Sequence, residues 1–340
     1  MVDTKNQSVN HNQIKLHGYE EHSCVQYSLR KQGSFHLLDR FIWIKEAHMT
    51  NYQEYLLPKS ISEALKYLTE GTGSAAVIAG GTDLLLELRQ GRHPAVDRLI
   101  DISEIPEMKQ ITRDDDQIVI GAGVTHKRII SDPLLLEHAQ CMVEGCGLIG
   151  GPQVRNVATI GGNVSHALPA GDGTISLLAL DSEVQITSHS GADWQPMIGI
   201  FAGPGKVNFD RSGTIVTGFR FKAKGEGEGS AFHRVMRPQG VAIAILNMAA
   251  WVKLDNEGKL DKVRIAVGPA GPKPLRAVQT EEYLAGKTWN EAVFAEAAEI
   301  LAEEVSLRTS KHRATKEYRH QLLPVLLQKV MDTAADRARL

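Results

Sequence analysis

The stretch Arg155-Asn156-Val157-Ala158-Thr159-Ile160-Gly161-Gly162-Asn163, which continues through Pro169 to Asp172, decides how this chain is interpreted. Two adjacent glycines, Gly161 and Gly162, lack the Cβ atoms that would keep a ligand away from the backbone, and they allow a positive φ angle. Successive backbone N–H groups exposed in this way form a concavity that binds anions and suits a diphosphate. Taken alone, the stretch is equally well interpreted as a tight turn between a strand and a helix.

A second loop of the same kind lies upstream, in Val77-Ile78-Ala79-Gly80-Gly81-Thr82-Asp83-Leu84. An apolar run enters it, as a buried strand would, and a helix-like run over 84–88 leaves it. Two such loops in one chain are able to hold the two ends of one diphosphate. Because each has Gly-Gly beside a small polar residue, the pair favours an anion site over two unrelated turns.

Length and composition indicate a globular protein of two or three domains. The chain has 340 residues, which exceeds a single ordinary core. Its hydrophobic fraction of 42% and charged fraction of 23% are typical of globular proteins. The net charge of −2 gives no electrostatic reason to expect nucleic acid or an anionic membrane surface. The apolar runs fall far short of the ~20 residues that a membrane span needs.

The three cysteines, Cys24, Cys141 and Cys146, are too few for a disulfide framework, which fits a reducing cytoplasm. They are also too few for an iron–sulfur cluster, which takes about four thiolates. Cys141 and Cys146 have a poor spacing for joint metal ligation on one helix, so we expect both to be packing residues. The sequence therefore predicts a cytoplasmic protein with no cluster of its own.

Strands and helices alternate from residue 51 onward. Ser60-Ile61-Ser62-Glu63 has the pattern of a capping box that opens a helix ending near Gly71. Short apolar strands are expected over 75–79, 98–102, 117–120 and 183–187, a helix over 134–149, and a helical turn over 176–181. This alternation with two glycine turns indicates an α/β architecture.

A charged, glycine-rich tract over 222–230 marks a boundary, and we expect a solvated hinge or loop there. Beyond it the chain is strongly apolar over 241–254 and alternates like a strand over 263–267. Helices are expected over 280–284, 291–305 and 314–335. Pro324 lies inside the last of these and predicts a kink or a late start.

Residues 1–48 are polar and lack a sustained period, so we do not expect them to belong to the fold. Two interpretations stay open. Met49 is the true initiator, which we favour, or the segment is a real and partly disordered extension. The expected domains are therefore 49–224 and 225–335.

Three familiar catalytic motifs are missing. The sequence has no GxxxxGK[ST], HExxH or GxSxG pattern, so nucleotide hydrolysis, zinc proteolysis and α/β-hydrolase chemistry lack support. His126, His166 and His189 are scattered and are interpreted as ordinary surface or core histidines. Asp172 is either a loop-capping carboxylate or an acceptor for a ribose-type hydroxyl. No acid–base pair presents itself.

At these residues the chain resembles the FAD-binding medium subunits of molybdenum hydroxylases. This group includes carbon monoxide dehydrogenase medium chains and the flavin domain of xanthine dehydrogenase. The resemblance spans roughly residues 51–335. The matching pieces are 79–84, 151–156, 159–163 with Pro169 and Asp172, and Arg313-Ala314 followed by Glu317-Tyr318-Arg319.

The resemblance implies an α/β (α+β) chain in two folded parts. The first, over 49–224, is a two-part FAD-binding domain of the PCMH or vanillyl-alcohol-oxidase-like type. The second, over 225–335, is a smaller C-terminal α+β domain of the CO dehydrogenase flavoprotein type.

It also implies FAD in an extended pose, with its diphosphate between the two glycine loops and no catalytic residue on this chain. The implied cofactor-binding residues are Val77, Ile78, Ala79, Gly80, Gly81, Thr82, Asp83, Leu84, Ile149, Thr159, Ile160, Gly161, Gly162, Asn163, Asp172, Val216, Phe232 and His233. His233 stands where a lysine is seen in xanthine dehydrogenase-like members, so a charge there depends on pH.

The resemblance finally implies an electron-transferring oxidoreductase subunit. Its partners would be a molybdopterin-binding large subunit and a 2Fe-2S small subunit, in a dimer of heterotrimers, with no nucleic acid and no membrane span. A self-sufficient FAD oxidoreductase, such as a cell-wall-precursor reductase, is the alternative. That enzyme would require a substrate-binding domain with a catalytic acid, and we see no candidate residue for such an acid. A flavin-free scaffold subunit is a third possibility.

Overall fold

The computed structural model describes residues 17–19, 22–24, 52–237, 243–311 and 313–340. The chain divides into two units, Met1–Asn51 and Tyr52–Leu340. In the first, β1 (His17–Tyr19) pairs antiparallel with β2 (His22–Cys24). The expectation that residues 1–48 form an extension or an annotation artefact concerns residues that lie mostly outside the described ones.

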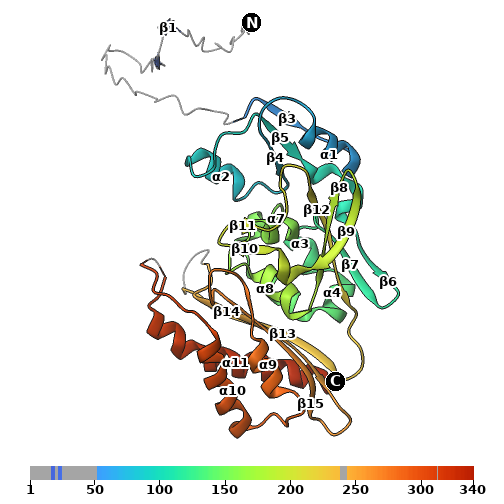
Figure 1. Cartoon of the computed structure of the whole chain (residues 1–340), viewed down its shortest axis with the longest axis vertical. Coiled ribbons are helices and arrows are strands. Elements are labelled where there is room, and N and C mark those ends of the chain that lie inside the picture. The colour runs from blue at the N-terminus through green and yellow to red at the C-terminus, as the bar shows by residue number, and fades with distance from the viewer. Residues whose placement is uncertain (1–16, 20–21, 25–51, 238–242, 312) are drawn as a thin grey trace, which may run out of the picture. The chain divides into compact units, whose positions relative to one another are not determined.

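The second unit begins with a small parallel sheet in the order β3-β5-β4 (Figure 1). Its strands and helices are β3 (Glu54–Leu56), α1 (Ile61–Thr69), β4 (Ala75–Ile78), α2 (Leu84–Arg89) and β5 (Arg98–Asp101), followed by the 3-10 turns η1 (Ile102–Glu104) and η2 (Pro106–Lys109). Ser60 caps α1 by accepting a hydrogen bond from the backbone N–H of Glu63, and Glu63 in turn accepts from the N–H of Lys59. The capping signal in the sequence is confirmed.

A five-stranded antiparallel sheet follows, in the order β6-β7-β12-β8-β9. Its strands are β6 (Ile111–Asp114), β7 (Gln117–Gly121), β8 (Glu183–Ser188), β9 (Gly191–Pro196) and β12 (Ile215–Lys222). Between these lie α3 (His126–Ile129), α4 (Pro133–His138), α5 (Gln140–Gly147), α6 (Pro152–Arg155), α7 (Ile160–Ser165), α8 (Asp172–Ala179), η3 (Met197–Ile200), β10 (Phe201–Gly203) and β11 (Lys206–Val207). The single helix expected over 134–149 is wrong, because Ala139, with φ −145° and ψ 52°, lies outside the helical region and separates α4 from α5.

The C-terminal part is an antiparallel sheet, β13-β14-β15-β16, covered by helices. Its elements are β13 (Glu228–Val235), β14 (Leu246–Leu254), β15 (Leu260–Gly268), β16 (Leu275–Arg276), α9 (Val278–Leu284), α10 (Glu291–Glu304) and α11 (Lys316–Ala338). The late start predicted from Pro324 is wrong, since α11 runs through it.

The predicted hinge is shorter than expected. Glu228, Gly229 and Ser230 are buried in β13, and a Cβ on Gly229 would lie 2.2 Å from the carbonyl oxygen of Ala334 in α11. Only glycine permits this approach of strand to helix. The solvated link is thus confined to the residues between β12 and β13.

The C-terminal sheet has a core on each face, because successive residues of a strand point to opposite sides. Ala249 and Trp251 of β14 belong to the core shared with α5 and α8, whereas Met248 and Ala250 belong to the core under α11. Figure 1 shows β13–β15 between α8 and the helices α9–α11. The expected mixture of helices and sheets is confirmed.

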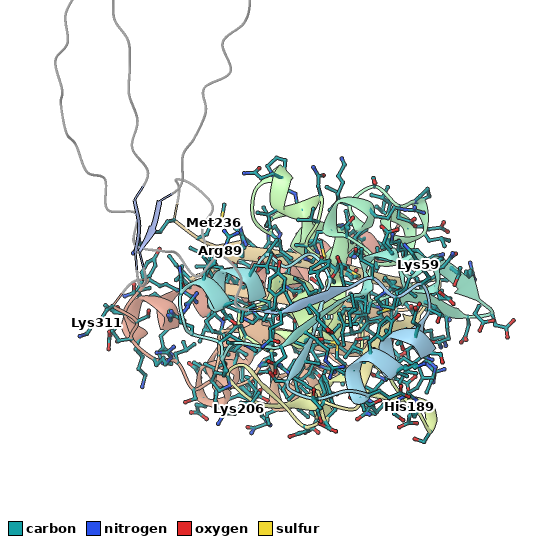
Figure 2. The ribbon with its side chains drawn as sticks, turned by 90° about the horizontal axis from the view of Figure 1, so that it is seen from above. Lys59, Arg89, His189, Lys206, Met236 and Lys311 are labelled. Carbon is teal, nitrogen blue, oxygen red and sulfur yellow. The ribbon has the colours of Figure 1, made fainter. Side chains whose placement is uncertain are left out.

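The exposed side chains of Lys59, Arg89, Lys206 and Lys311 lie at the periphery of the folded unit in Figure 2. Among the residues that the structure describes, no helix combines the length and the apolar character needed to cross a membrane.

Candidate cofactor site

The first glycine loop connects β4 to α2 and carries unpaired backbone donors. Gly81 has a φ of +64°, a conformation that favours glycine. Within the described part of the chain, the N–H groups of Gly80, Gly81, Thr82 and Asp83 donate to no protein acceptor. Four consecutive free donors beside a helix start form the kind of surface that binds an anion.

The two loops touch each other through their backbones. A Cβ on Gly80 would lie 2.2 Å from the carbonyl oxygen of Val157 and 2.8 Å from the Cα of Ala158. Val157 and Ala158 immediately precede the second glycine loop, so the two segments that are distant in sequence meet at Gly80. The structure therefore brings the two predicted loops together.

The second loop differs from the expectation. Thr159 caps α7, and the N–H groups of Ile160, Gly161, Gly162 and Asn163 all donate within the chain, at 2.8–3.1 Å. The expected row of exposed N–H groups is wrong for this loop, because the Gly-Gly pair forms the first turn of a helix.

Gly161 and Gly162 serve different purposes. A Cβ on Gly161 would lie 2.6 Å from the carbonyl oxygen of Ala122, so this glycine lets α7 pack against the end of β7. Gly162 is exposed, and a Cβ there would meet only the Thr159 hydroxyl, at 3.2 Å. Gly162 is thus the position of the pair at which a ligand can approach the backbone.

A histidine makes a second link between the loops. His166, at the end of α7, lies 3.2 Å from Glu87 and 3.7 Å from Asp83, measured from Nε2 and Nδ1 to the respective carboxylates. Both acids belong to the first loop and its helix. The contact holds α2 near α7 without occupying the N–H groups of the first loop.

Arg155 positions the segment that contains Ile149. Its Nη1 donates to the carbonyl oxygens of Ile149 and Gly150, both at 2.9 Å. His126 lies buried nearby and its backbone N–H bonds the carbonyl of Ala158. Burial and the positive charge of Arg155 lower the pKa of His126 to about 4, so this histidine is neutral at neutral pH.

Asp172 begins α8 and is held from several sides. Asn163 accepts hydrogen bonds from the N–H and hydroxyl of Thr174, at 3.0 and 3.1 Å, and so fixes the start of the helix. The carboxylate of Asp172 forms a buried ion pair with Arg234 and accepts from Asn247 Nδ2 at 2.6 Å. Burial raises the pKa of Asp172, and the charge of Arg234 with the Asn247 hydrogen bond opposes that shift.

Arg234 also reaches the Ile149 segment, because its Nη2 donates to the carbonyl oxygen of Leu148 at 2.6 Å. One guanidinium from the C-terminal sheet therefore connects Asp172 to the residue before Ile149. In the sequence Arg234 directly follows the expected site residues Phe232 and His233, and that position was the available signal for its role.

Phe232 and His233 point to opposite faces of β13. Phe232 is buried in the core shared with the first part, and its N–H donates to Glu144 at 2.8 Å. His233 faces α11, where Nε2 lies 3.5 Å from the hydroxyl of Thr333. The structure thus places Arg234, and not His233, on the face of Asp172; contact of His233 with a cofactor stays a prediction.

Val216 is buried in β12, and Ile149 is half-buried. Cys141 and Cys146 are free and buried, which confirms their expected packing role, and burial raises the pKa of both thiols. Among the described residues, no group of three or more His, Cys, Asp or Glu side chains is arranged to hold a metal.

Comparison with known proteins agrees with this geometry. Residues 49–221 match the FAD binding domain in molybdopterin dehydrogenase, and residues 230–334 match the CO dehydrogenase flavoprotein C-terminal domain. The chain is 30% identical over 292 residues to a xanthine dehydrogenase FAD-binding subunit of Escherichia coli O157:H7, covering 85% of this chain and 98% of that one. It is 31% identical over 236 residues to the nicotinate dehydrogenase FAD-subunit of Eubacterium barkeri, covering 68% and 79%.

A solved structure of carbon monoxide dehydrogenase from Hydrogenophaga pseudoflava superimposes with a TM-score of 0.79 at 26% identity, covering 84% of this chain and 97% of that one. The family match includes the first glycine loop with its free donors, the second loop and Asp172. The chain therefore belongs to the family of FAD-binding subunits of molybdenum hydroxylase-type oxidoreductases, and its cofactor is FAD.

Proposed function

We propose that this chain transfers electrons from the iron–sulfur clusters of a partner subunit to an external acceptor. The observation that carries the proposal is the run of four free N–H donors over Gly80–Asp83, held against the second loop at Val157. A diphosphate supplies the acceptors that these donors lack. The residues present therefore fit an FAD, whose isoalloxazine supplies the redox chemistry when bound.

The chain's own residues bind and orient the cofactor in this proposal. Gly80–Asp83 hold the diphosphate, and Gly162 leaves room for it to approach α7. Arg155 and Arg234 hold the carbonyls of Leu148, Ile149 and Gly150 and so fix the wall that Ile149 contributes. None of these residues has to donate or remove a proton, because an electron-transfer flavoprotein needs no general acid or base.

The partners in this proposal are a molybdopterin-binding large subunit and a 2Fe-2S small subunit, in a dimer of heterotrimers. The relatives support a multi-subunit setting, since they are themselves named as FAD-binding subunits or medium chains. We also propose a cytoplasmic location, because the buried thiols of Cys141 and Cys146 are free.

Two measurements test the proposal. A tagged full-length chain, isolated under mild conditions, should carry a flavin spectrum and co-purify with proteins that contain molybdenum and iron. The substrate of that complex should bleach the flavin in the complex but not in the isolated chain. Substrate turnover by the isolated chain would favour a self-sufficient oxidoreductase, and a colourless chain would favour a scaffold.

A further inference from the structure

Three arginines gather where α11 begins. Arg308 lies in the segment after α10, Arg313 in the turn before the helix, and Arg319 in the first turns of α11. Arg319 is only 2% exposed, Arg313 is half-buried and Arg308 is exposed. The cluster is therefore recessed, with one member open to solvent.

No carboxylate balances this charge within the described part of the chain. None of the three guanidiniums makes a hydrogen bond or an ion pair there, and the buried Nε of Arg319 has no partner. The charges that act on Arg319 are those of Arg313 and Arg308; together with burial, which is the larger cause, they lower its pKa. Burial and Arg308 lower the pKa of Arg313 in the same way. Holding like charges close together in a partly desolvated site costs free energy unless an anion binds between them.

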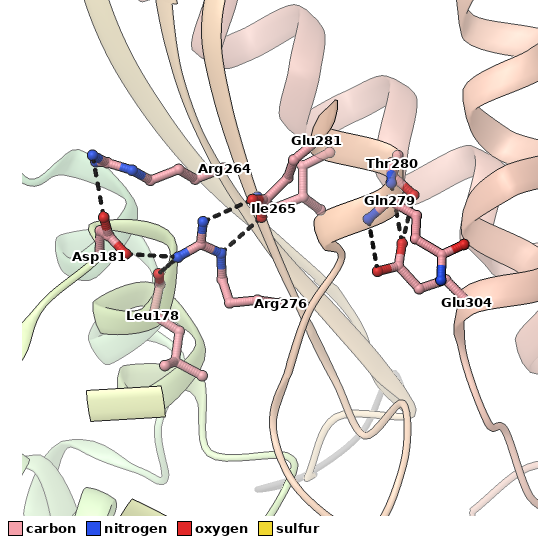
Figure 3. A network of polar contacts seen from close by, with 9 residues as sticks. All are labelled: Leu178, Asp181, Arg264, Ile265, Arg276, Gln279, Thr280, Glu281 and Glu304. Atoms are coloured by element: carbon pink, nitrogen blue, oxygen red, sulfur yellow. Dashed lines mark hydrogen bonds and ion pairs between the residues drawn. The ribbon is translucent and has the colours of Figure 1, made fainter. Parts of the chain in front are cut away.

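Two other recessed arginines of this protein, Arg264 and Arg276, are neutralised by acids. Figure 3 shows Arg276 bonded to both carboxylate oxygens of Glu281, at 2.7 and 2.8 Å, and to Asp181 at 3.0 Å. Arg264 lies 3.4 Å from the same Asp181. Arg98 is buried as well and has no acid, but its guanidinium donates to the carbonyl oxygens of Tyr67 and Glu70. Arg308, Arg313 and Arg319 have neither kind of partner among the described residues.

We propose that Arg308, Arg313 and Arg319 form a binding site for a phosphate group, separate from the glycine loops that hold FAD. A planar guanidinium matches the oxygens of a phosphate in pairs, and one phosphate carries up to two negative charges. A small anion also reaches the recessed Arg319 more readily than a side chain of a folded partner would. Arg308 and Lys311 are exposed, and Lys311 projects at the periphery in Figure 2, so the cluster is accessible from the surface. The phosphate is either free or borne by a nucleotide.

The test uses the full chain loaded with FAD in a phosphate-free buffer, with ionic strength held constant by sodium chloride. Inorganic phosphate and adenosine 5′-monophosphate are added separately, with adenosine as the control that lacks the charged group. A near-saturating phosphate should raise the melting temperature by roughly 5 °C, and adenosine should not. A larger rise with the nucleotide identifies a nucleotide as the source, and an equal rise identifies free phosphate.

Two variants, Arg308→Gln and Arg313→Gln, should lose most of this rise and keep their flavin. Without phosphate, Arg308→Gln should melt at or above the temperature of the unmodified chain, because one of three like charges is gone. Arg92→Gln removes an exposed arginine of the first part and is the matched control, in which the full rise should persist.

Three results would overturn the proposal. A melting temperature that neither phosphate nor the nucleotide changes would show that the cluster binds no phosphate group. An equal rise in both variants would place phosphate elsewhere. Loss of flavin in Arg308→Gln would show that these guanidiniums serve the FAD itself; the proposed electron-transfer function would survive that result.

Discussion

Replacing each glycine of the second loop by alanine separates folding from cofactor binding. At Gly161 the new methyl group would lie 2.6 Å from the carbonyl oxygen and 2.7 Å from the Cβ of Ala122. Such overpacking costs about 1–3 kcal/mol of stability. At Gly162 the methyl group meets only the Thr159 hydroxyl, at 3.2 Å, and alanine is favoured over glycine inside a helix by about 1 kcal/mol. The two variants should therefore change the stability of the flavin-free chain in opposite directions.

Cofactor affinity should respond differently. If FAD lies against the exposed backbone of Gly162, the methyl group crowds the cofactor and should cost about 1–3 kcal/mol of binding free energy. This corresponds to roughly 5–150-fold weaker binding. Urea unfolding of the flavin-free chain measures the stability, and titration with FAD followed by flavin fluorescence measures the affinity. Gly199→Ala is the control, because a Cβ there has no atom within 4 Å. A Gly162→Ala chain that binds FAD as tightly as the unmodified chain would refute this placement of the cofactor.

Four further predictions concern the cofactor, the N-terminus, the buried ion pair and pH. Neither glycine loop contains a His or Cys, so acid precipitation should release all the flavin, and a yellow pellet would contradict non-covalent binding. A chain that begins at Met49 should bind FAD and melt as the full chain does; insolubility would show that residues 1–48 contribute to folding. Arg234→Met leaves Asp172 buried without its partner and should lower the free energy of unfolding by about 3–5 kcal/mol, whereas an unchanged urea midpoint would contradict the pair's role. The pKa of His126 is lowered from 6.5 to about 4, so below pH 6.5 the unfolded chain binds more protons than the folded chain. The free energy of unfolding should therefore fall by up to about 3 kcal/mol as the pH drops from 6.5 to 4. His126→Leu should flatten this pH dependence, and the same pH dependence in both chains would contradict the role of His126.

Local chemistry was predictable from the sequence. Ser60 and Glu63 mark the start of α1 because capping needs only residues three apart. The strand before the first glycine loop and the helix after it follow from apolar runs on either side of two glycines. Cys141 and Cys146 are core residues, as their spacing suggested. In each case the information lies within a few residues.

Properties that depend on distant segments were not predictable. A Gly-Gly pair after Thr159 is compatible both with exposed N–H groups and with the start of a helix. In the structure the carbonyl oxygen of Ala122 accepts from the N–H of Gly161 at 2.8 Å, which stabilises the helix start. The choice between His233 and Arg234 depends on which face of β13 meets α8, and a shift of one residue reverses every side chain of a strand. The break at Ala139 interrupts an apolar period that continues across it.

The C-terminal domain contributes to the cofactor site that we propose, although the two glycine loops both precede it in sequence. Asn247 of β14 donates to the carbonyl of Ala170 at 3.2 Å and to Asp172 at 2.6 Å, and Arg234 of β13 closes the ion pair with Asp172. A Cβ on Gly268 would lie 2.2 Å from the carbonyl oxygen of Pro169, so β15 also contacts this segment directly. Three strands thus contact the segment that connects α7, which contains Gly162, to α8, which begins at Asp172. Arg234 and Asn247, which bind the carboxylate of Asp172, both belong to the C-terminal sheet, so the first domain alone lacks them. The geometry of the FAD site that we propose therefore depends on both domains.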